Sequence, residues 1–414
     1  MKMSILNLLV FFYLYFMKII TLLAVVLFPY CVHAQHPHAD GQMRDAIKIS
    51  EKGNPKQAEW IFSKIISDHP FFAEPYFQRA GVREKMGDLE GALTDYNILL
   101  ELSPTHTEGI FSRGIVRYEM KHYELSKEDF LKVLALPQGE TNSVLYRKSP
   151  YKSGIDRITT LQNGQQDYIY QHLGLICMEL EDYNEALHYL EKAIALRPDD
   201  PDHYLHRGKI FQSSGQVENA EKDYIKALSL NPYHPMVHQY MGILANASGD
   251  KLKADRYYSQ AIAEAPDVPY PYKQRGYQRL IAGQIEGALE DFHKVLELKR
   301  DDVETLLYRG FAFEKKGELG AAQKDFEQVL VLEPSRSQAW IGLGDVQVKS
   351  GKLPEAVKSY TLAIIYQPEN PQAHYQRGIA HHKLKDVDQA CIDFQQAAQW
   401  GLDPALKALE KACQ

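Results

Sequence analysis

The chain has 414 residues, of which 45% are hydrophobic and 24% are charged, and its 47 basic and 54 acidic residues give a formal net charge of −7. These proportions are those of a globular protein, and they argue against both an intrinsically disordered chain and a polytopic membrane protein. The sequence also has no basic stripe or polybasic segment, so nucleic acid and anionic lipid are not expected partners.

The N-terminal segment differs from the rest of the chain, because residues 1–34 contain no acidic residue and are mostly apolar. A lysine directly after Met17, an apolar run over 19–28 and a small-residue site at 32–34 follow the pattern of a secretory signal peptide. We therefore predict a signal peptide over 1–34, with Met17 as an alternative start of translation. Export to the periplasm or out of the cell follows, and membrane contact is expected only if the segment stays uncleaved as an anchor.

The cysteines bear on this prediction, because export leaves an odd number of them in an oxidising compartment, namely Cys177, Cys391 and Cys413. An odd number implies at least one free thiol or an intermolecular bond. Cys177 falls at a helix packing position, which favours a buried apolar role. A bond between Cys391 and Cys413 near the C-terminus is left open by the sequence.

From residue 39 onward the chain repeats every 34 residues. The ten units begin at Ala39, Ala73, Thr107, Asp167, Pro201, Pro235, Pro269, Val303, Ser337 and Pro371. Position 8 is always small: Ala46, Ala80, Gly114, Gly174, Gly208, Gly242, Gly276, Gly310, Gly344 and Gly378. Position 20 is Ala in nine units, and position 32 is Pro in seven. Position 24 is aromatic except at Leu190: Phe62, Tyr96, Phe130, Tyr224, Tyr258, Phe292, Phe326, Tyr360 and Phe394.

This pattern predicts a pair of antiparallel helices in each unit. Small residues at positions 8 and 20 allow close helix approach, and the aromatic residue at position 24 fills the space beside them. Glycine at position 15 suits the turn, and proline at position 32 ends the second helix. The pattern resembles the tetratricopeptide repeat over about residues 39–404. The resemblance implies an all-α, right-handed superhelical solenoid of about ten helix-turn-helix repeats.

The expected organisation follows the phase of the repeat. Three repeats occupy 35–137, a polar insertion or hinge occupies 138–166, seven contiguous repeats occupy 167–404, and a capping helix occupies 405–414. The insertion is rich in Gly and charged residues, which predicts a solvated loop or hinge. A partner-contacting element is the alternative interpretation.

A charge pair also recurs with the repeat. Position 7 is Arg and position 23 is Asp in the same six units. Both positions lie eight residues from the turn, so they are expected at the same height on the hairpin. We predict a bidentate structural clamp rather than a catalytic or phosphate site.

Motifs for catalysis are absent from the sequence. It contains no glycine-rich phosphate loop, His-Glu-x-x-His helix or nucleophile elbow. His203, His206, His234 and His238 could approach one another in stacked repeats, but they lack carboxylate or thiolate support at ligand spacing. We therefore expect no enzyme activity, no cofactor and no metal site, with a hydrolase or metalloenzyme as the disfavoured alternative.

The resemblance also implies a ligand groove, lined in this family by first-helix positions 2, 5, 6, 9 and 12. No three consecutive units carry the Lys and Asn pattern with which some members clamp a C-terminal carboxylate. The face is instead aromatic and amide-rich, and the candidate partner-binding residues are Gln239, Tyr240, Tyr270, Lys273, Gln274, Tyr277, Tyr308 and Phe311. Packing between helices is the alternative role for each aromatic ring.

The expected function is therefore an exported, non-catalytic scaffold or adaptor that binds a protein or peptide partner in this groove. Amide side chains can pair with an extended peptide backbone, and tyrosine rings supply rigid apolar contact. The alternative is a glycan-binding or cell-wall-binding module of the envelope, because the same rings can stack on sugars.

Overall fold

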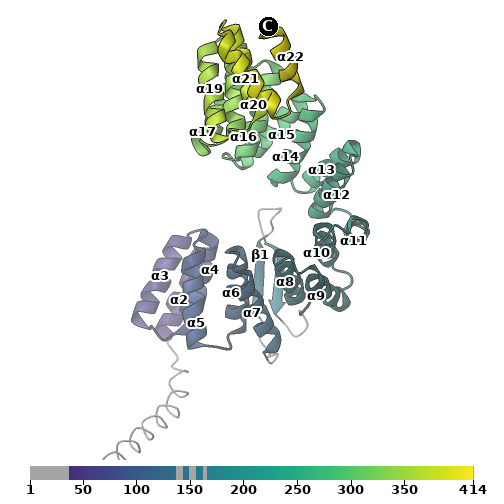
Figure 1. The fold of residues 1–414 in the computed structure, drawn as a ribbon. Helices are drawn as coiled ribbons and strands as arrows, with labels where there is room; N and C mark the ends of the chain where they lie inside the picture. Colours follow the sequence, from purple (N-terminus) through teal and green to yellow (C-terminus); the bar gives the residue numbers. More distant parts are fainter. Residues whose placement is uncertain (1–36, 137–142, 149–154, 162–165, 414) are drawn as a thin grey trace, which may run out of the picture. The chain divides into compact units, whose positions relative to one another are not determined.

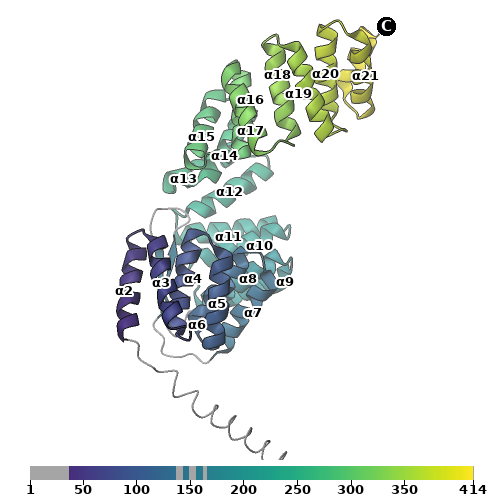
Figure 2. The same cartoon turned by 90° about the vertical axis from the view of Figure 1, so that its left-hand side faces the viewer.

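The computed structural model describes residues 37–136, 143–148, 155–161 and 166–413. These residues form 21 helices, α2 to α22, and one two-stranded antiparallel sheet (Figures 1 and 2). The predicted signal peptide over 1–34 lies outside them. Among the described helices, none combines the length and the hydropathy needed to cross a bilayer. The chain divides into two compact units, residues 1–138 and 139–414, and each is described by itself.

The first unit consists of three helix pairs. Each pair packs against the next, and the pairs coincide with the first three predicted repeats. The helices are α2 (Pro37–Glu51), α3 (Pro55–Asp68), α4 (Ala73–Met86), α5 (Leu89–Leu102), α6 (Thr107–Glu119) and α7 (Tyr123–Ala135).

The second unit opens with a β-hairpin and continues with seven helix pairs and a final single helix. The pairs are α8 (Gln166–Glu179) and α9 (Tyr183–Leu196), α10 (Pro201–Ser213) and α11 (Val217–Leu230), α12 (Pro235–Ala247) and α13 (Lys251–Glu264), α14 (Pro269–Ile281) and α15 (Ile285–Leu298), α16 (Val303–Lys316) and α17 (Leu319–Leu332), α18 (Ser337–Lys349) and α19 (Leu353–Tyr366), α20 (Pro371–Lys383) and α21 (Val387–Gln399). The last helix is α22 (Asp403–Ala412). The prediction of a helical-repeat solenoid is confirmed.

Close helix contact within each pair depends on the small residue at position 8. A Cβ atom added to Gly310 on α16 would lie 2.7 Å from the Phe326 ring on α17, which is too close for any real contact. Phe326 is fully buried and belongs to a core cluster that reaches the following pair through Ala339. The position-24 ring therefore packs beside position 8 of its own repeat, as predicted, and it also packs against the next repeat.

The turn between the paired helices has a left-handed backbone. Seven of the ten turns carry glycine at position 15, with φ between 76° and 87°. Lys121, Glu181 and Lys385 occupy the same position with φ of 62° to 65°. The turn between the two helices sets this conformation, so these three residues adopt backbone angles that an L-residue rarely takes.

The insertion contains regular structure that its composition did not indicate. Strand β1 (Ser143–Lys148) pairs antiparallel with β2 (Ile155–Leu161), with an irregularity in the register after Arg147. These strands differ from the loop that was expected here, whereas the role of the segment as a hinge stays a prediction. The prediction relied on the Gly, Pro and charged residues of the whole segment. It overlooked two short runs that contain Val, Ile, Thr and Tyr, residue types that favour strands.

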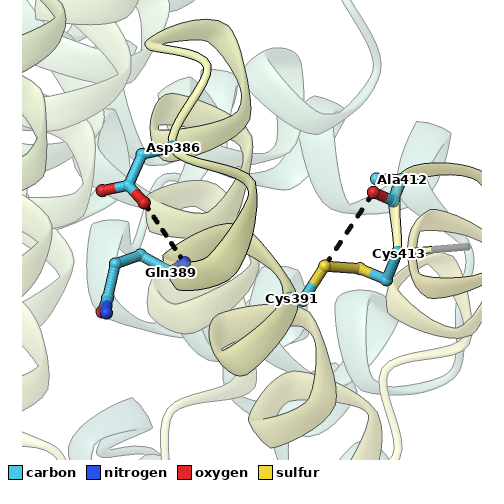
Figure 3. The surroundings of a disulfide bond; sticks show 5 residues. All are labelled: Asp386, Gln389, Cys391, Ala412 and Cys413. Carbon is cyan, nitrogen blue, oxygen red and sulfur yellow. Dashed lines mark hydrogen bonds between the residues drawn. A yellow bond between two sulfur atoms is a disulfide. The ribbon is translucent and has the colours of Figure 1, made fainter.

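The C-terminal helix is joined to the last helix pair by a disulfide. Cys391 on α21 is bonded to Cys413, directly after α22 (Figure 3). This is the pairing that the sequence left open. Helix α22 begins at Asp403, two residues before the predicted boundary, and it packs against α21 with Ala405 buried. Cys177 on α8 is fully buried, as predicted.

Candidate binding surface on the first helices

The predicted Arg–Asp clamps are present in all six repeats. In each one, Nε and Nη2 of the arginine donate to the two carboxylate oxygens at 2.6–3.0 Å. The six aspartates are buried. The pairs are Arg79–Asp95, Arg113–Asp129, Arg207–Asp223, Arg275–Asp291, Arg309–Asp325 and Arg377–Asp393. They join the two helices of a repeat and form a structural element rather than a reactive site.

The clamps also connect successive repeats, a contact that the sequence left open without indicating the acceptor at position 25. In four of them the remaining nitrogen, Nη1, donates to a side chain at position 25 of the preceding repeat, at 2.8–3.1 Å. The acceptors are Ser63, Asn97, Ser259 and Thr361. The signal was available in the sequence, because short polar residues stand at position 25 before these four arginines.

The predicted partner-binding residues come from three first helices of the second unit. Gln239 and Tyr240 lie on α12, Tyr270, Lys273, Gln274 and Tyr277 lie on α14, and Tyr308 and Phe311 lie on α16. All eight side chains are partly exposed, so none is confined to the core and none is fully solvated. We call these residues the tyrosine surface.

Aromatic contacts link α14 to α16 within the tyrosine surface. The rings of Tyr277 and Tyr308 have centroids 4.8 Å apart and are tilted by 39°. Tyr308 also lies over the buried Phe292, with centroids 6.1 Å apart. Burial raises the pKa of the Tyr308 hydroxyl, and the nearby Glu304 carboxylate adds to this. Phe311 makes an edge contact with the buried Phe326 at 5.1 Å, so this ring contributes to the core as well as to the surface.

Lys273 is held by two carboxylates rather than projecting as an isolated cation. Its Nζ donates to Glu304 at 2.9 Å and to Asp302 at 3.4 Å. Asp302 also caps α16 by accepting from the backbone N–H of Thr305 at 3.1 Å. Burial lowers the pKa of Lys273, but the hydrogen bond to Glu304 and the charge of Asp302 outweigh it, so the pKa is raised. The ion pairs thus connect α14 to the N-terminus of α16.

The tyrosine surface continues onto α10 through Lys209, which was not among the predicted residues. Tyr240 stacks on the buried Tyr224 with centroids 5.8 Å apart, and Nζ of Lys209 on α10 lies 5.5 Å from the centre of the Tyr240 ring. Burial lowers the pKa of Lys209. Burial raises the pKa of Tyr270, with a further contribution from Tyr240. Lys209 stands at position 9, one of the family's groove positions, so it could have been selected from the sequence on that basis.

Three of the four histidines considered as metal ligands have separate partners. His203 is fully buried and contacts Gln171 and Asp167 at 2.8 and 3.1 Å, whereas His234 pairs with Asp202 and His238 with the Pro232 carbonyl. The structure does bring Asp167 and Asp200 to His203, with one ligand atom from each within 4.8 Å of the others. These carboxylates come from a neighbouring repeat and a helix cap, so spacing along one helix could not reveal them.

This trio could hold a cation, but the chain supplies a positive charge there itself. Arg197 lies 3.2 Å from Asp167 and 3.6 Å from Asp200. A metal ion would have to displace the guanidinium group from both carboxylates. The arrangement is complete as a buried ion-pair cluster between α8 and α10.

The comparisons with known proteins agree with the repeat pattern. Residues 174–215 and 344–385 match a model described as "TPR repeat", and residues 202–234 and 371–400 match one described as "Tetratricopeptide repeat". Tetratricopeptide repeat protein 16 of Macaca fascicularis is 26% identical over 175 residues, which cover 41% of this chain and 18% of the relative. The Hsp70-Hsp90 organizing protein of Triticum aestivum is 32% identical over 103 residues, which cover 23% and 17% of the two chains. The chain thus spans less than a fifth of the length of these curated relatives.

A solved structure with a similar fold is YrrB, described as a TPR protein with an unusual peptide-binding site. It is 21% identical, with a TM-score of 0.42, over 44% of this chain and 95% of that one.

The stacked helix pairs and their 34-residue period define an α-solenoid, a class of protein that offers the faces of its repeats to other molecules. The matched models and the conformity of all ten units identify the repeat itself. The chain contains tetratricopeptide repeats, which the models match over residues 174–234 and 344–400, and protein interaction is the general role of such repeats.

Proposed function

We propose that the protein is an exported scaffold that binds an extended segment of a partner protein on the tyrosine surface of α12, α14 and α16. The observation that carries the proposal is the row of partly exposed Tyr240, Tyr270, Tyr277 and Tyr308 on successive first helices. Rings that are already packed against each other lose little freedom on binding, so they suit a contact surface.

The polar groups beside the rings favour a peptide backbone as the ligand. Gln239 and Gln274 lie on the same helices as three of the tyrosines and are partly exposed, so they supply amide donors and acceptors that an extended main chain can use. Lys273 is already neutralised by Glu304 and Asp302. A partner held through its C-terminal carboxylate at this lysine is therefore disfavoured.

Export is supported by the C-terminal disulfide together with the signal-peptide pattern of residues 1–34. Disulfides between Cys residues such as Cys391 and Cys413 persist in oxidising compartments and are rare in the reducing cytosol. Fractionation of cells, followed by maleimide labelling with and without a reductant, tests this. We expect two additional labels after reduction of the exported protein. Unreduced protein that is fully labelled and remains in the cytosol would contradict export.

The binding proposal is tested with a displayed library of random linear peptides selected on the full protein. Peptides that bind the native protein should lose about tenfold or more in affinity for the Tyr277→Ala/Tyr308→Ala variant, because buried aromatic anchors carry much of the energy of such interfaces. The matched control removes two exposed tyrosines elsewhere, in Tyr233→Ala/Tyr366→Ala. Circular dichroism establishes that both variants are folded.

Equal affinity for the two double variants would contradict the tyrosine surface as the site. If no peptide binds, soluble wall oligosaccharides provide the second arm. Their protection of Tyr277 and Tyr308 from nitration would favour the glycan-binding alternative.

A further inference from the structure

A cavity of about 610 Å³ opens beside the clamp of Arg309 and Asp325, between α15, α16 and α17. It shares no residue with the tyrosine surface. Leu296 and Leu306 are buried and supply its apolar lining. Its more exposed lining residues are His293, Glu297, Arg300, Lys324 and Gln328.

Arg309 differs from four of the other clamp arginines in the use of Nη1. Those four donate Nη1 to a hydroxyl or amide at position 25 of the preceding repeat. Here position 25 is His293, whose Nδ1 donates to the Leu289 carbonyl at 2.6 Å. Within the described part of the chain Arg309 donates hydrogen bonds only to Asp325, through Nε and Nη2, and its guanidinium group lies over the Phe313 ring. The N–H groups of Nη1 are therefore available beside the cavity.

The remaining clamp shows what the protein places in this position when no short polar side chain is present. Position 25 before Arg207 is Glu191. The hydrogen bond to Asp223 raises the pKa of Arg207, and the charge of the exposed Glu191 raises it further. A carboxylate on the position-25 side is thus electrostatically favourable for a clamped arginine.

The charges around the cavity set the type of anion. The lining contains three cationic residues, Arg300, Arg309 and Lys324, and two acidic ones, Glu297 and Asp325, so its net charge is +1 when His293 is neutral. A singly charged group balances this better than a phosphate dianion does. The buried leucines beside the charges favour an apolar portion of the ligand.

We propose that this cavity binds a monoanionic carboxylate with an apolar body. Nη1 of Arg309 donates to the carboxylate, Arg300 and Lys324 attract it at the rim, and the apolar body contacts Leu296 and Leu306. The site is separate from the tyrosine surface and does not depend on the function proposed for it.

The test uses 4-fluorobenzoate as a free acid, observed by fluorine NMR with the full protein. A second probe is a capped tripeptide that ends in Phe, as its free C-terminal acid and as its amide. His293→Ser should weaken binding of the acid about tenfold, because serine at position 25 supplies the internal acceptor that other repeats use for Nη1. Arg300→Gln should weaken it to a similar extent.

Lys358→Gln is the matched control, since Lys358 occupies the position of Lys324 in the next repeat and is exposed. It should leave binding unchanged. Binding of fluorobenzoate supports a free acid as the ligand, and binding of the tripeptide acid alone supports a C-terminal carboxylate. The proposal is overturned if neither acid binds, if the amide binds as well as the acid, if phosphate binds more tightly than either, or if His293→Ser and Arg300→Gln bind as the native protein does.

Discussion

At the scale of single residues, the repeat imposes one backbone conformation on side chains of different types. Lys385 adopts φ of 65° at the position where Gly351 adopts 76° one repeat earlier. A left-handed conformation costs an L-residue about 1–2 kcal/mol, and glycine avoids this cost at the expense of greater freedom in the unfolded chain. Glycine is therefore the favourable residue at this turn, and lysine is tolerated.

We predict that Lys385→Gly increases the free energy of unfolding by about 1 kcal/mol. Gly351→Lys, the reverse change at the matched position, should decrease it by a similar amount. Urea denaturation followed by circular dichroism measures both effects. A decrease for Lys385→Gly would mean that the lysine side chain makes a contact worth more than the backbone strain.

A second residue-scale prediction concerns the carboxyl group of Asp345. Burial raises its pKa to about 6, the hydrogen bond from the Tyr360 hydroxyl opposes this, and the charge of Glu314 adds to it. Because the folded pKa exceeds the usual unfolded value of about 3.9, the folded state takes up a proton as the pH falls. The associated stabilisation is present at low pH and is lost as the pH rises through about 6.

Asp345→Asn imitates the protonated form and retains an acceptor for Tyr360. We expect this variant to be more stable than the native protein by about 2 kcal/mol at pH 7.5 and equally stable near pH 4. Urea denaturation at several pH values measures the difference. The control is Asp301→Asn, at an exposed position. A gain for Asp345→Asn that does not change with pH would exclude the titration as its cause.

At the scale of elements, α22 depends on contacts outside itself. A helix of ten residues is marginal in water, so its stability comes from packing against α21 and from the bond between Cys391 and Cys413. The bond closes a loop across a sequence separation of 22 residues. A loop of this size corresponds to about 3 kcal/mol in the chain-entropy model.

We predict that Cys413→Ser accelerates amide hydrogen exchange in α22 and, to a lesser extent, in α21, while α14 to α16 exchange as before. Repeats contact mainly their neighbours, so loss of the cap acts at the end of the array. Reduction of the native protein should reproduce the effect, and the variant should not respond to reductant. Unchanged exchange in α22 would show that packing alone holds the helix.

At the scale of the whole molecule, the features that recur with the 34-residue period could be predicted and the singular ones could not. The helix pairs, the glycine turns and the Arg–Asp clamps each recur in several repeats, so the pattern can be distinguished from a coincidence in any one of them. The hairpin of β1 and β2 occurs once and carries no period. The contact of Lys273 with Glu304 spans two repeats, and no single unit contains both residues.

The same reasoning explains what was predictable about the candidate sites. Positions 2, 5, 6 and 9 indicated which side chains share the tyrosine surface, because the face of a helix follows from spacing. The cavity beside Arg309 depends on a missing contact, and it becomes visible only when His293 is compared with Ser259 and Thr361 at the same position in folded repeats. Such a comparison requires knowledge that position 25 approaches the next clamp.

The division of the chain into residues 1–138 and 139–414 leads to a final prediction. Stability in a repeat array is approximately a sum over repeats and their nearest-neighbour contacts, so a repeat far from a new end is little affected by truncation. Helices α14 to α16 are three or four repeats away from α8, the first helix of the second unit. A fragment of residues 139–414 should therefore fold, and α14 to α16 should show the same hydrogen-exchange protection as in the full protein.

Slower exchange near α8 than near α16 in the fragment would fit the additive model only if the β-hairpin caps the N-terminal end of the fragment. Loss of protection across α14 to α16 would contradict the additive picture and would show that the two units fold as one cooperative body.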